Sequence, residues 1–194
     1  MTPEKDIRVL YDEQTIAARI EELAHEIAEA DLKDLLVVAV LKGSFIFAAD
    51  LVRAMHRAKI SPEMEFLHLS SYGSGTKSSG NVTVLRDVQS NVSGRDVLLV
   101  DDILESGRTL DFARNRLMDR GANSVKVAAL LDKPGHRVAD ILADFTGFLC
   151  PDKFVVGYGM DIAHAYRQLP FIGHVVSADD SVVASATSKE NHLG

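Results

Sequence analysis

The sequence predicts an α/β protein with a mainly parallel, twisted sheet and helices on both of its faces. Apolar runs of strand length alternate along the chain with segments of helical period, and no internal repeat or interdomain linker interrupts that order. Two of the apolar runs also lead directly into a glycine-containing turn that opens a helix. Continuous apolar runs are typical of parallel strands, because helices cover both faces of such a sheet.

The first predicted elements are a helix, a strand and a second helix. Apolar residues recur at helical spacing from Ile16 to Ile27 with acids between them, which predicts a helix over residues 12–30 capped near its start. The continuous apolar run 35–41 predicts a buried strand. Ser44 is then expected to cap a helix over residues 45–56.

A hairpin and the central strand follow. Residues 64–69 are predicted as a strand, residues 70–80 as a loop rich in glycine and serine, and residues 81–86 as the returning strand. The run Val97 to Val100 has the length and β-branched content of a buried strand, and residues 109–120 are predicted as a helix.

The C-terminal third is predicted to be mostly strand. Residues 124–131 form the next predicted strand, and a breaker at Pro134-Gly135 separates it from those that follow. These are expected at residues 145–149, 154–156 and 171–176, the last of which closes the fold. From about residue 178 the chain is small, polar or acidic, and we expect a frayed tail there.

Length and composition favour a single globular domain over residues 1–194. A formal charge of −7 argues against a nucleic-acid surface, and no apolar stretch reaches the roughly 18 residues of a membrane span. The first ten residues show no export signal and Cys150 is the only cysteine, so we expect a cytoplasmic protein without disulfides. Cys150 is expected to be a buried apolar residue rather than a nucleophile.

The most informative segment is V-L-L-V-D-D-I-L-E-S-G-R-T-L, residues 97–110. Asp101 and Asp102 lie at the carboxyl end of the predicted strand, where open α/β sheets bind ligands. The two acids point to opposite faces if the strand continues, and either can turn toward a polyol or a divalent metal. The alternative is that they simply end a strand.

The turn over residues 105–109 is suited to an anion. Gly107 permits a tight turn, the exposed backbone N–H groups form a cradle, and Ser106 and Thr109 add hydroxyl donors. A structural alternative is that Ser106 only caps the helix. Two acids beside a phosphate cradle together indicate a phosphorylated sugar bound with magnesium.

The fourteen-residue string is similar to the phosphoribosyl pyrophosphate signature of the type I phosphoribosyltransferases. The chain contains neither a Walker loop nor a complete dinucleotide fingerprint. The resemblance implies that family's sheet, with a small hood from the terminal segments. It also implies that Asp101 and Asp102 meet the ribose and Mg²⁺. The 5-phosphate would be held by the turn that comprises Glu105, Ser106, Gly107, Arg108 and Thr109, with Arg108 acting through its backbone.

Further segments extend the resemblance over residues 7–176 and narrow it to the family's 6-oxopurine members. Lys42-Gly43 is similar to the pyrophosphate loop, which implies a cis peptide between Leu41 and Lys42. Arg167 would grip pyrophosphate, and Ser71-Tyr72 would head a mobile lid. Read alone, Lys42 is more often a surface lysine, and the lid a flexible hairpin.

The same resemblance implies a purine site. Lys133, just past a predicted strand, would donate to the 6-oxo group, which an ammonium favours over the amino group of adenine. Phe154 would stack on the purine, the Val155 backbone would read its edge, and Asp161 would orient a second magnesium. A role in the core is the alternative for Phe154.

Glu105 stands where the family usually has the aspartate that acts as general base. Its additional methylene moves the carboxylate by on the order of 1 Å, and we assign it the same role as a hypothesis. The implied reaction transfers a phosphoribosyl group to hypoxanthine or guanine, in a homodimer or homotetramer. Two alternatives stay open: a non-catalytic regulator that senses the same activated sugar, and an enzyme for another base such as adenine or xanthine.

Overall fold

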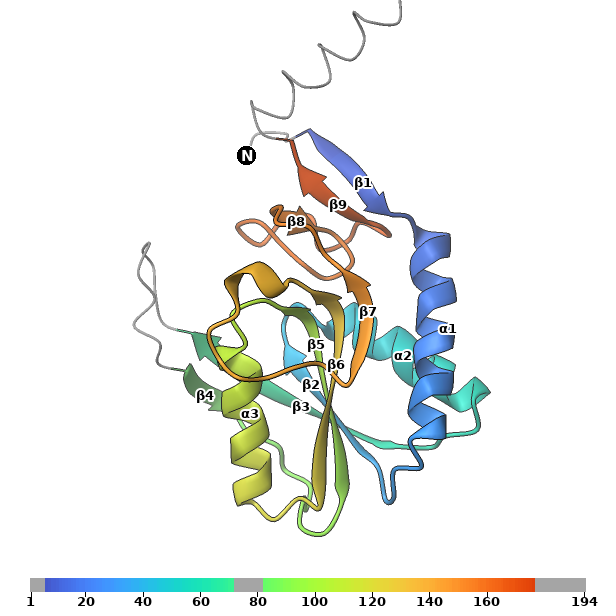
Figure 1. The fold of residues 1–194 in the computed structure, drawn as a ribbon, viewed down its shortest axis with the longest axis vertical. Coiled ribbons are helices and arrows are strands. Elements are labelled where there is room, and N and C mark those ends of the chain that lie inside the picture. Colours follow the sequence, from blue (N-terminus) through green and yellow to red (C-terminus); the bar gives the residue numbers. More distant parts are fainter. Residues whose placement is uncertain (1–5, 72–81, 177–194) are drawn as a thin grey trace, which may run out of the picture.

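A computed structural model describes residues 6–71 and 82–176, which form two β-sheets and their helices (Figure 1). The larger sheet has the strand order β4-β3-β2-β5-β6-β7, and the smaller one the order β1-β9-β8. The strands are β1 (Ile7–Tyr11), β2 (Leu36–Leu41), β3 (Glu63–Ser71), β4 (Val82–Arg86), β5 (Asp96–Leu104), β6 (Ser124–Asp132), β7 (Phe145–Leu149), β8 (Val155–Val156) and β9 (Ile172–Val175). The helices are α1 (Glu13–Glu29), α2 (Phe45–Arg57), α3 (Arg108–Asp119) and a short 3-10 turn at Pro134–His136.

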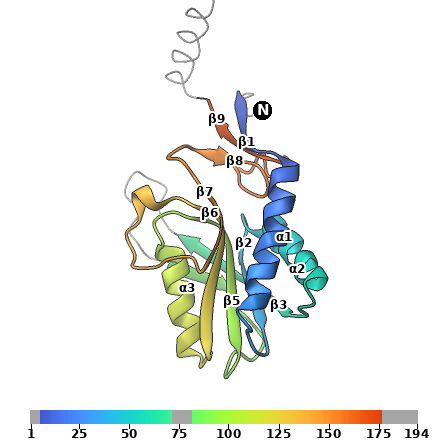
Figure 2. The same cartoon turned by 45° about the vertical axis from the view of Figure 1, so that its right-hand side comes forward.

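The six-stranded sheet confirms the predicted fold class. Strands β3, β2, β5, β6 and β7 run parallel, and β4 joins the edge antiparallel to β3. Helices α1 and α2 cover one face and α3 covers the other (Figures 1 and 2). Alternate residues of β2 divide between the two cores: Val37 and Ala39 face α1 and α2, while Leu36 and Val38 face α3. Both faces are therefore buried, as continuous apolar strands require.

The hood is the smaller, antiparallel sheet. Residues 171–176 were predicted as the last strand of the fold, and β9 pairs with β1 and β8 in this second sheet, as the implied hood of terminal segments requires. Strand β1 was not predicted at all, since its sequence IRVLY is short and only half-buried. In Figure 1 the hood lies at one end of the six-stranded sheet. Phe154 and Val155 reach the functional site from this hood.

Two helix starts differ in how they are capped. The Asp12 carboxylate accepts from the Thr15 N–H at 2.8 Å, which confirms the predicted cap of α1. Ser44 stands at the start of α2, but the prediction that its side chain caps the helix is wrong. Its buried hydroxyl donates to the Val40 carbonyl at 2.5 Å, so it ties the helix start back to β2.

The central strand is longer than its apolar run. Strand β5 continues to Leu104, because Ile103 and Leu104 pair with Leu131 and Asp132 of β6. The two acids therefore lie within the hydrogen-bonded part of β5 rather than beyond its end. This pairing fixes their backbone and places their side chains on opposite faces of the sheet.

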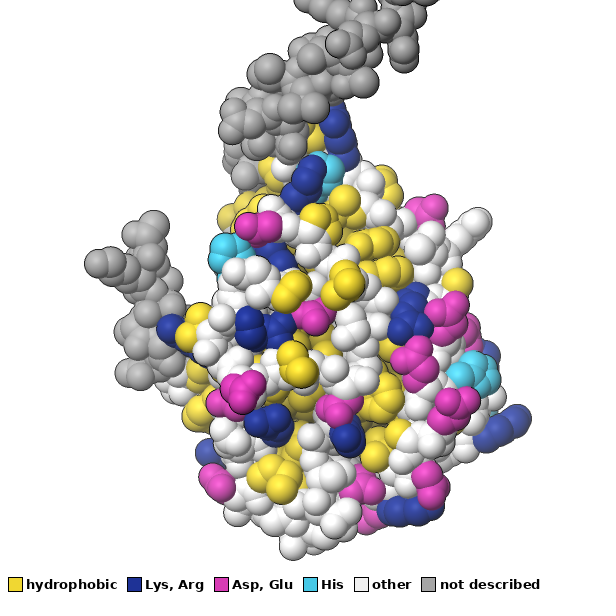
Figure 3. Space-filling model, in the orientation of Figure 1, with side chains coloured by type: hydrophobic (Ala, Val, Ile, Leu, Met, Phe, Trp, Pro, Cys, Tyr) yellow, Lys and Arg dark blue, Asp and Glu magenta, His cyan; other side chains and the backbone are white. Residues whose placement is uncertain are grey.

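Several expectations concern segments outside the described residues. Tyr72, most of the predicted lid and the tail beyond residue 176 are not described, so these stay predictions. No helix in the described ranges is long and apolar enough to cross a membrane. On the face shown in Figure 3, basic and acidic side chains are intermingled, and no broad basic patch gathers among the described residues.

Candidate active site

Two adjoining cavities open at the carboxyl ends of the parallel strands, and they share Ile103 and Glu105 as lining residues. The larger has a volume of about 340 Å³ and the smaller about 200 Å³. The larger cavity brings together these predicted site residues: Lys42, Gly43, Asp102, Glu105, Lys133, Phe154, Val155, Asp161 and Arg167. The smaller is lined by Asp101 and by the turn residues Glu105, Ser106, Gly107 and Thr109. Segments that are far apart in the sequence therefore converge on one continuous hollow.

Asp101 and Asp102 lie in different cavities, as alternation along β5 requires. Burial raises the pKa of Asp101 well above its usual value, and the neighbouring charge of Asp102 adds to the rise. Burial also raises the pKa of Asp102. The carboxylate of Asp101 accepts the Asp102 N–H at 3.0 Å, and neither acid forms an ion pair with a described residue. The positive charge of Arg167 partly opposes the rise for Asp102, but no ion pair neutralises either acid, so the two carboxyl groups together favour a positive ligand.

The Lys42-Gly43 loop packs directly against these acids. The peptide between Leu41 and Lys42 is cis, as the resemblance implied. A Cβ added to Gly43 would lie 1.8 Å from Asp102 Oδ2, so only glycine fits there. On its other side the loop meets Gly159, whose φ is +102° and whose added Cβ would lie 2.1 Å from the Gly43 carbonyl oxygen. The Lys42-Gly43 loop is thus enclosed between β5 and the segment that carries Asp161.

The turn after β5 has the geometry of an anion cradle. Gly107 has a φ of +80° and precedes the first residue of α3, so the turn uses the left-handed conformation that glycine tolerates. Ser106 and Thr109 line the smaller cavity at the N-terminal end of this helix. Arg108 opens α3 between them and does not line the cavity, which is consistent with a contact through its backbone alone.

Glu105 and Lys133 form an ion pair inside the larger cavity. Lys133 Nζ lies 2.9 Å from Glu105 Oε1 and 3.3 Å from Asp152 Oδ1. Burial alone would lower the pKa of Lys133, but its bonds to these two carboxylates raise it above its usual value. The ammonium therefore stays charged and keeps its donors. Glu105, His136 and Asp152 offer ligand atoms within 4.8 Å of one another, but Lys133 already forms ion pairs with both acids.

The hood and the segment after it supply the remaining residues. Phe154 is 61% exposed, so the alternative that it is a core residue is wrong, and its ring is available at the cavity. Val155 is buried beside it. Arg167 lies 2.6 Å from Asp161 Oδ1 and donates to the Gly159 carbonyl at 2.6 Å. Since Asp161 Oδ2 accepts from the His164 N–H at 2.7 Å, both oxygens of Asp161 already have donors.

Arg137 is a residue that sequence reasoning missed. Its guanidinium donates to the carbonyls of Glu105 at 2.9 Å, Leu104 at 3.2 Å and Ile141 at 2.5 Å, and it also pairs with Asp132. One side chain therefore holds the backbone of the turn after β5 in place. Three of its partners are main-chain carbonyls, which leave no trace in the pattern of residue types, so no sequence signal pointed to it.

Comparisons with known proteins agree with this geometry. Residues 7–163 match the phosphoribosyl transferase domain family. The chain is 45% identical over 168 residues to the hypoxanthine-guanine phosphoribosyltransferase of Bacillus subtilis, covering 86% of this chain and 91% of that protein. It is also 46% identical over 167 residues to the bifunctional protein TilS/HprT of Listeria monocytogenes, covering 86% of this chain. The chain spans about a quarter of the length of that bifunctional relative.

A solved structure shows the same architecture. The crystal structure of a hypoxanthine phosphoribosyltransferase from Staphylococcus aureus superposes with a TM-score of 0.82 at 39% sequence identity, covering 87% of this chain and 91% of that one. The fold, the strand-end cavities and the sequence matches lead to one conclusion: the chain belongs to the phosphoribosyltransferase family.

Proposed function

We propose that this chain transfers the 5-phosphoribosyl group from 5-phosphoribosyl 1-pyrophosphate to a 6-oxopurine, giving a nucleoside monophosphate and pyrophosphate in purine salvage. The observation that carries the proposal is that two adjoining cavities bring together a phosphate cradle, the adjacent acids Asp101 and Asp102, the cationic Lys42-Gly43 loop, and a lysine donor beside an exposed aromatic ring. The relatives named as hypoxanthine or hypoxanthine-guanine phosphoribosyltransferases support the same activity.

The ion pair between Glu105 and Lys133 is complementary to one edge of a 6-oxopurine. A purine of this class carries an oxygen acceptor at position 6 and, on the five-membered ring beside it, the N–H whose proton is lost when a ring nitrogen is ribosylated. Lys133 supplies the donor for the oxygen, and Glu105 supplies the acceptor for the proton. Phe154 offers a face on which the ring stacks, and the Val155 backbone reads the opposite edge. Adenine presents an amino group to the same ammonium and is disfavoured.

The activated sugar occupies the rest of the hollow. Ser106, Gly107 and Thr109, with the backbone of Arg108, hold the 5-phosphate at the start of α3. Asp101 and Asp102 bind the ribose hydroxyls. Their carboxylates also fit Mg²⁺, because oxygen atoms of acids that no ion pair neutralises are ligands that this ion prefers. Asp161 is proposed to orient a second magnesium, although its two oxygens would then have to exchange their present donors.

In the reaction the purine nitrogen attacks the anomeric carbon as the bond to pyrophosphate breaks. Positive charge develops on the ribose and negative charge on the leaving group. Lys42, the backbone of Gly43, and Arg167 stabilise the leaving group, and Glu105 accepts the proton of the attacking nitrogen. When bound, magnesium supplies further neutralisation of the pyrophosphate charge. The Ser71-Tyr72 segment is proposed to begin a lid that excludes water.

The experiment that tests this function is a spectrophotometric assay with hypoxanthine, guanine, xanthine and adenine in parallel, with and without Mg²⁺. We expect turnover with hypoxanthine or guanine, little with adenine, and none after chelation. No turnover with any base, together with measurable binding of the activated sugar, would refute the enzyme and favour a regulator. We further propose that the protein acts in the cytoplasm as a homodimer or homotetramer, which sedimentation of the purified chain would test.

A further inference from the structure

The segment that carries Asp161 and Arg167 has no place in the six-stranded sheet. Residues 157–169 bond mainly to one another: the Tyr158 N–H donates to the Leu169 carbonyl at 2.9 Å and the Gly159 N–H to the Arg167 carbonyl at 3.0 Å. The backbone of Gly159 touches that of Gly43. The distance between Arg167 and the Lys42-Gly43 loop therefore depends on how this segment, here called the arginine loop (residues 157–169), is fixed to the rest of the fold.

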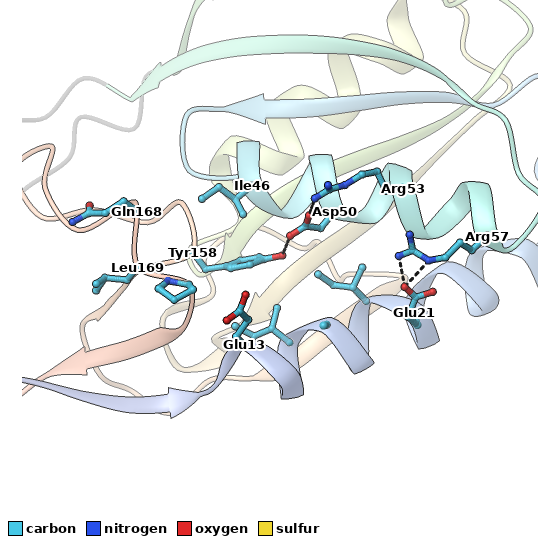
Figure 4. A pocket seen from close by; sticks show the side chains of 13 residues that line it. Glu13, Glu21, Ile46, Asp50, Arg53, Arg57, Tyr158, Gln168 and Leu169 are labelled. Carbon is cyan, nitrogen blue, oxygen red and sulfur yellow. Dashed lines mark hydrogen bonds and ion pairs between the residues drawn. The ribbon is translucent and has the colours of Figure 1, made fainter.

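Tyr158 and Met160 are the buried side chains of the arginine loop, and Tyr158 is the one whose polar group bonds to a helix. It is only 6% exposed although its φ is +50°, a conformation that a bulky residue adopts only when its surroundings hold it. Its hydroxyl donates to Asp50 Oδ2 on α2, while Asp50 Oδ1 pairs with Arg53 (Figure 4). Burial, with Asp50 as the next cause, raises the pKa of Tyr158, so the hydroxyl keeps its proton and remains a donor.

Helix α2 is the element that follows the pyrophosphate loop. It starts at Phe45, two residues after Gly43, and its start is tied to β2 through the Ser44 hydroxyl. The bond between Tyr158 and Asp50 thus connects the arginine loop to the same rigid helix that fixes Lys42 and Gly43. The two parts of the proposed pyrophosphate site, the arginine loop and the Lys42-Gly43 loop, are therefore both attached to α2.

We propose that Tyr158 and Asp50 are positioning residues, whose hydrogen bond holds Arg167 and Asp161 at the correct distance from the Lys42-Gly43 loop and so sets the affinity for the pyrophosphate end of the activated sugar. The inference rests on the proposed function. Neither residue lines the active-site cavity. Both instead line a separate hollow of about 360 Å³ between α1, α2 and the arginine loop, so they act through the loop rather than on the substrate.

The test is a double-mutant cycle with Tyr158→Phe, Asp50→Leu and the double variant. Tyr158→Phe removes one hydroxyl and keeps the ring. We expect it to raise the KM for 5-phosphoribosyl 1-pyrophosphate roughly tenfold, the effect of losing a hydrogen bond to a charged group, and to leave the KM for hypoxanthine within about twofold. The double variant should be no worse than the poorer single variant, since all three lose the same bond.

Tyr11→Phe is the matched control, because the Tyr11 hydroxyl also donates a long-range hydrogen bond, to the Leu149 carbonyl at 2.8 Å, away from the arginine loop. It should leave both KM values unchanged. Three results would overturn the inference: an unchanged KM for the sugar in Tyr158→Phe, an equal rise in both KM values, or additive effects in the double variant.

Failure of the proposed function is recognised separately. If the wild-type chain turns over no purine, the positioning role of the Tyr158–Asp50 hydrogen bond is tested by hydrogen exchange. Faster exchange of the Gly159 amide in Tyr158→Phe than in the wild type, with exchange in α2 unchanged, supports the positioning role. Equal exchange of this amide in the variant and the wild type refutes it.

Discussion

Replacing Asp101 with asparagine should stabilise the free protein and abolish its activity. Asp101 is 7% exposed, and its carboxylate accepts the Asp102 N–H, a bond that an asparagine oxygen retains. The substitution removes a buried carboxylate that no ion pair with a described residue compensates. We expect the free energy of unfolding to rise by about 1–3 kcal/mol near pH 8, the range for such a group. For a chain of this size that is roughly 2–12 °C in Tm.

The pH dependence gives the sign of the effect. The pKa of Asp101 is higher in the folded protein than in the unfolded chain. Its contribution to the free energy of unfolding is therefore fully present below the pKa of the unfolded chain. This contribution is lost as the pH rises through the pKa of the folded protein. The advantage of Asp101→Asn over the wild type should therefore grow between pH 5 and pH 8. Urea unfolding in EDTA, at several pH values, measures it without any bound metal.

Asp96 is the matched control, because it lies in the same strand and is 6% exposed. Its carboxylate accepts three bonds of 2.7 Å, from the Lys33 N–H, Asn123 and Ser124, with the Lys33 backbone bond as the largest cause that lowers its pKa. Asp96→Asn should therefore destabilise the protein by about 1–3 kcal/mol. The reasoning is refuted if both variants shift stability in the same direction, or if Asp101→Asn loses stability at pH 8.

Three further predictions concern the active site. Glu105→Gln should lower kcat about 100-fold or more with small changes in either KM, and an unchanged rate at every pH would remove Glu105 from proton transfer. Lys133→Gln should raise the KM for hypoxanthine roughly tenfold or more and reduce discrimination against adenine, as parallel assays with the two bases would show. Arg137→Lys, whose single nitrogen cannot replace the three separated nitrogens that reach these carbonyls and Asp132, should raise the KM for the activated sugar about tenfold; an equal rise for hypoxanthine would indicate general unfolding instead.

Local patterns accounted for most of the fold and for the strand-end site. The apolar runs before Lys42 and Asp101 predicted β2 and β5, because strands buried on both faces leave a simple hydrophobic signal. The residues of the smaller cavity, and Lys42, Gly43 and Asp102 of the larger one, followed from the strings at the ends of those strands, whose carboxyl ends meet at one edge of the sheet. Phe154, Asp161 and Arg167 lie outside the six-stranded sheet, and only the family resemblance pointed to them.

The hood and the supporting contacts could not be predicted in this way. Strand β9 joins β1 across more than 160 residues of sequence, and neither strand carries a pattern that names its partner. Tyr158 and Asp50 are 108 residues apart, and Arg137 bonds chiefly to carbonyls. Such contacts depend on tertiary packing rather than on local residue types.

The glutamate at position 105 is where the chain departs from the usual aspartate, and its surroundings limit how the site can adjust. Arg137 holds the carbonyls of Leu104 and Glu105, so the backbone of the turn is not free to shift and compensate for a longer side chain. The additional methylene must be accommodated by the side chain itself, and the carboxylate comes to rest on Lys133 at 2.9 Å. In the proposed site, an entering oxopurine has to separate this ion pair. Lys133 then donates to the purine oxygen and Glu105 accepts a purine N–H, in place of the bond between the two side chains. Because a base such as adenine offers no acceptor to Lys133 in return, the resting ion pair itself contributes to selectivity.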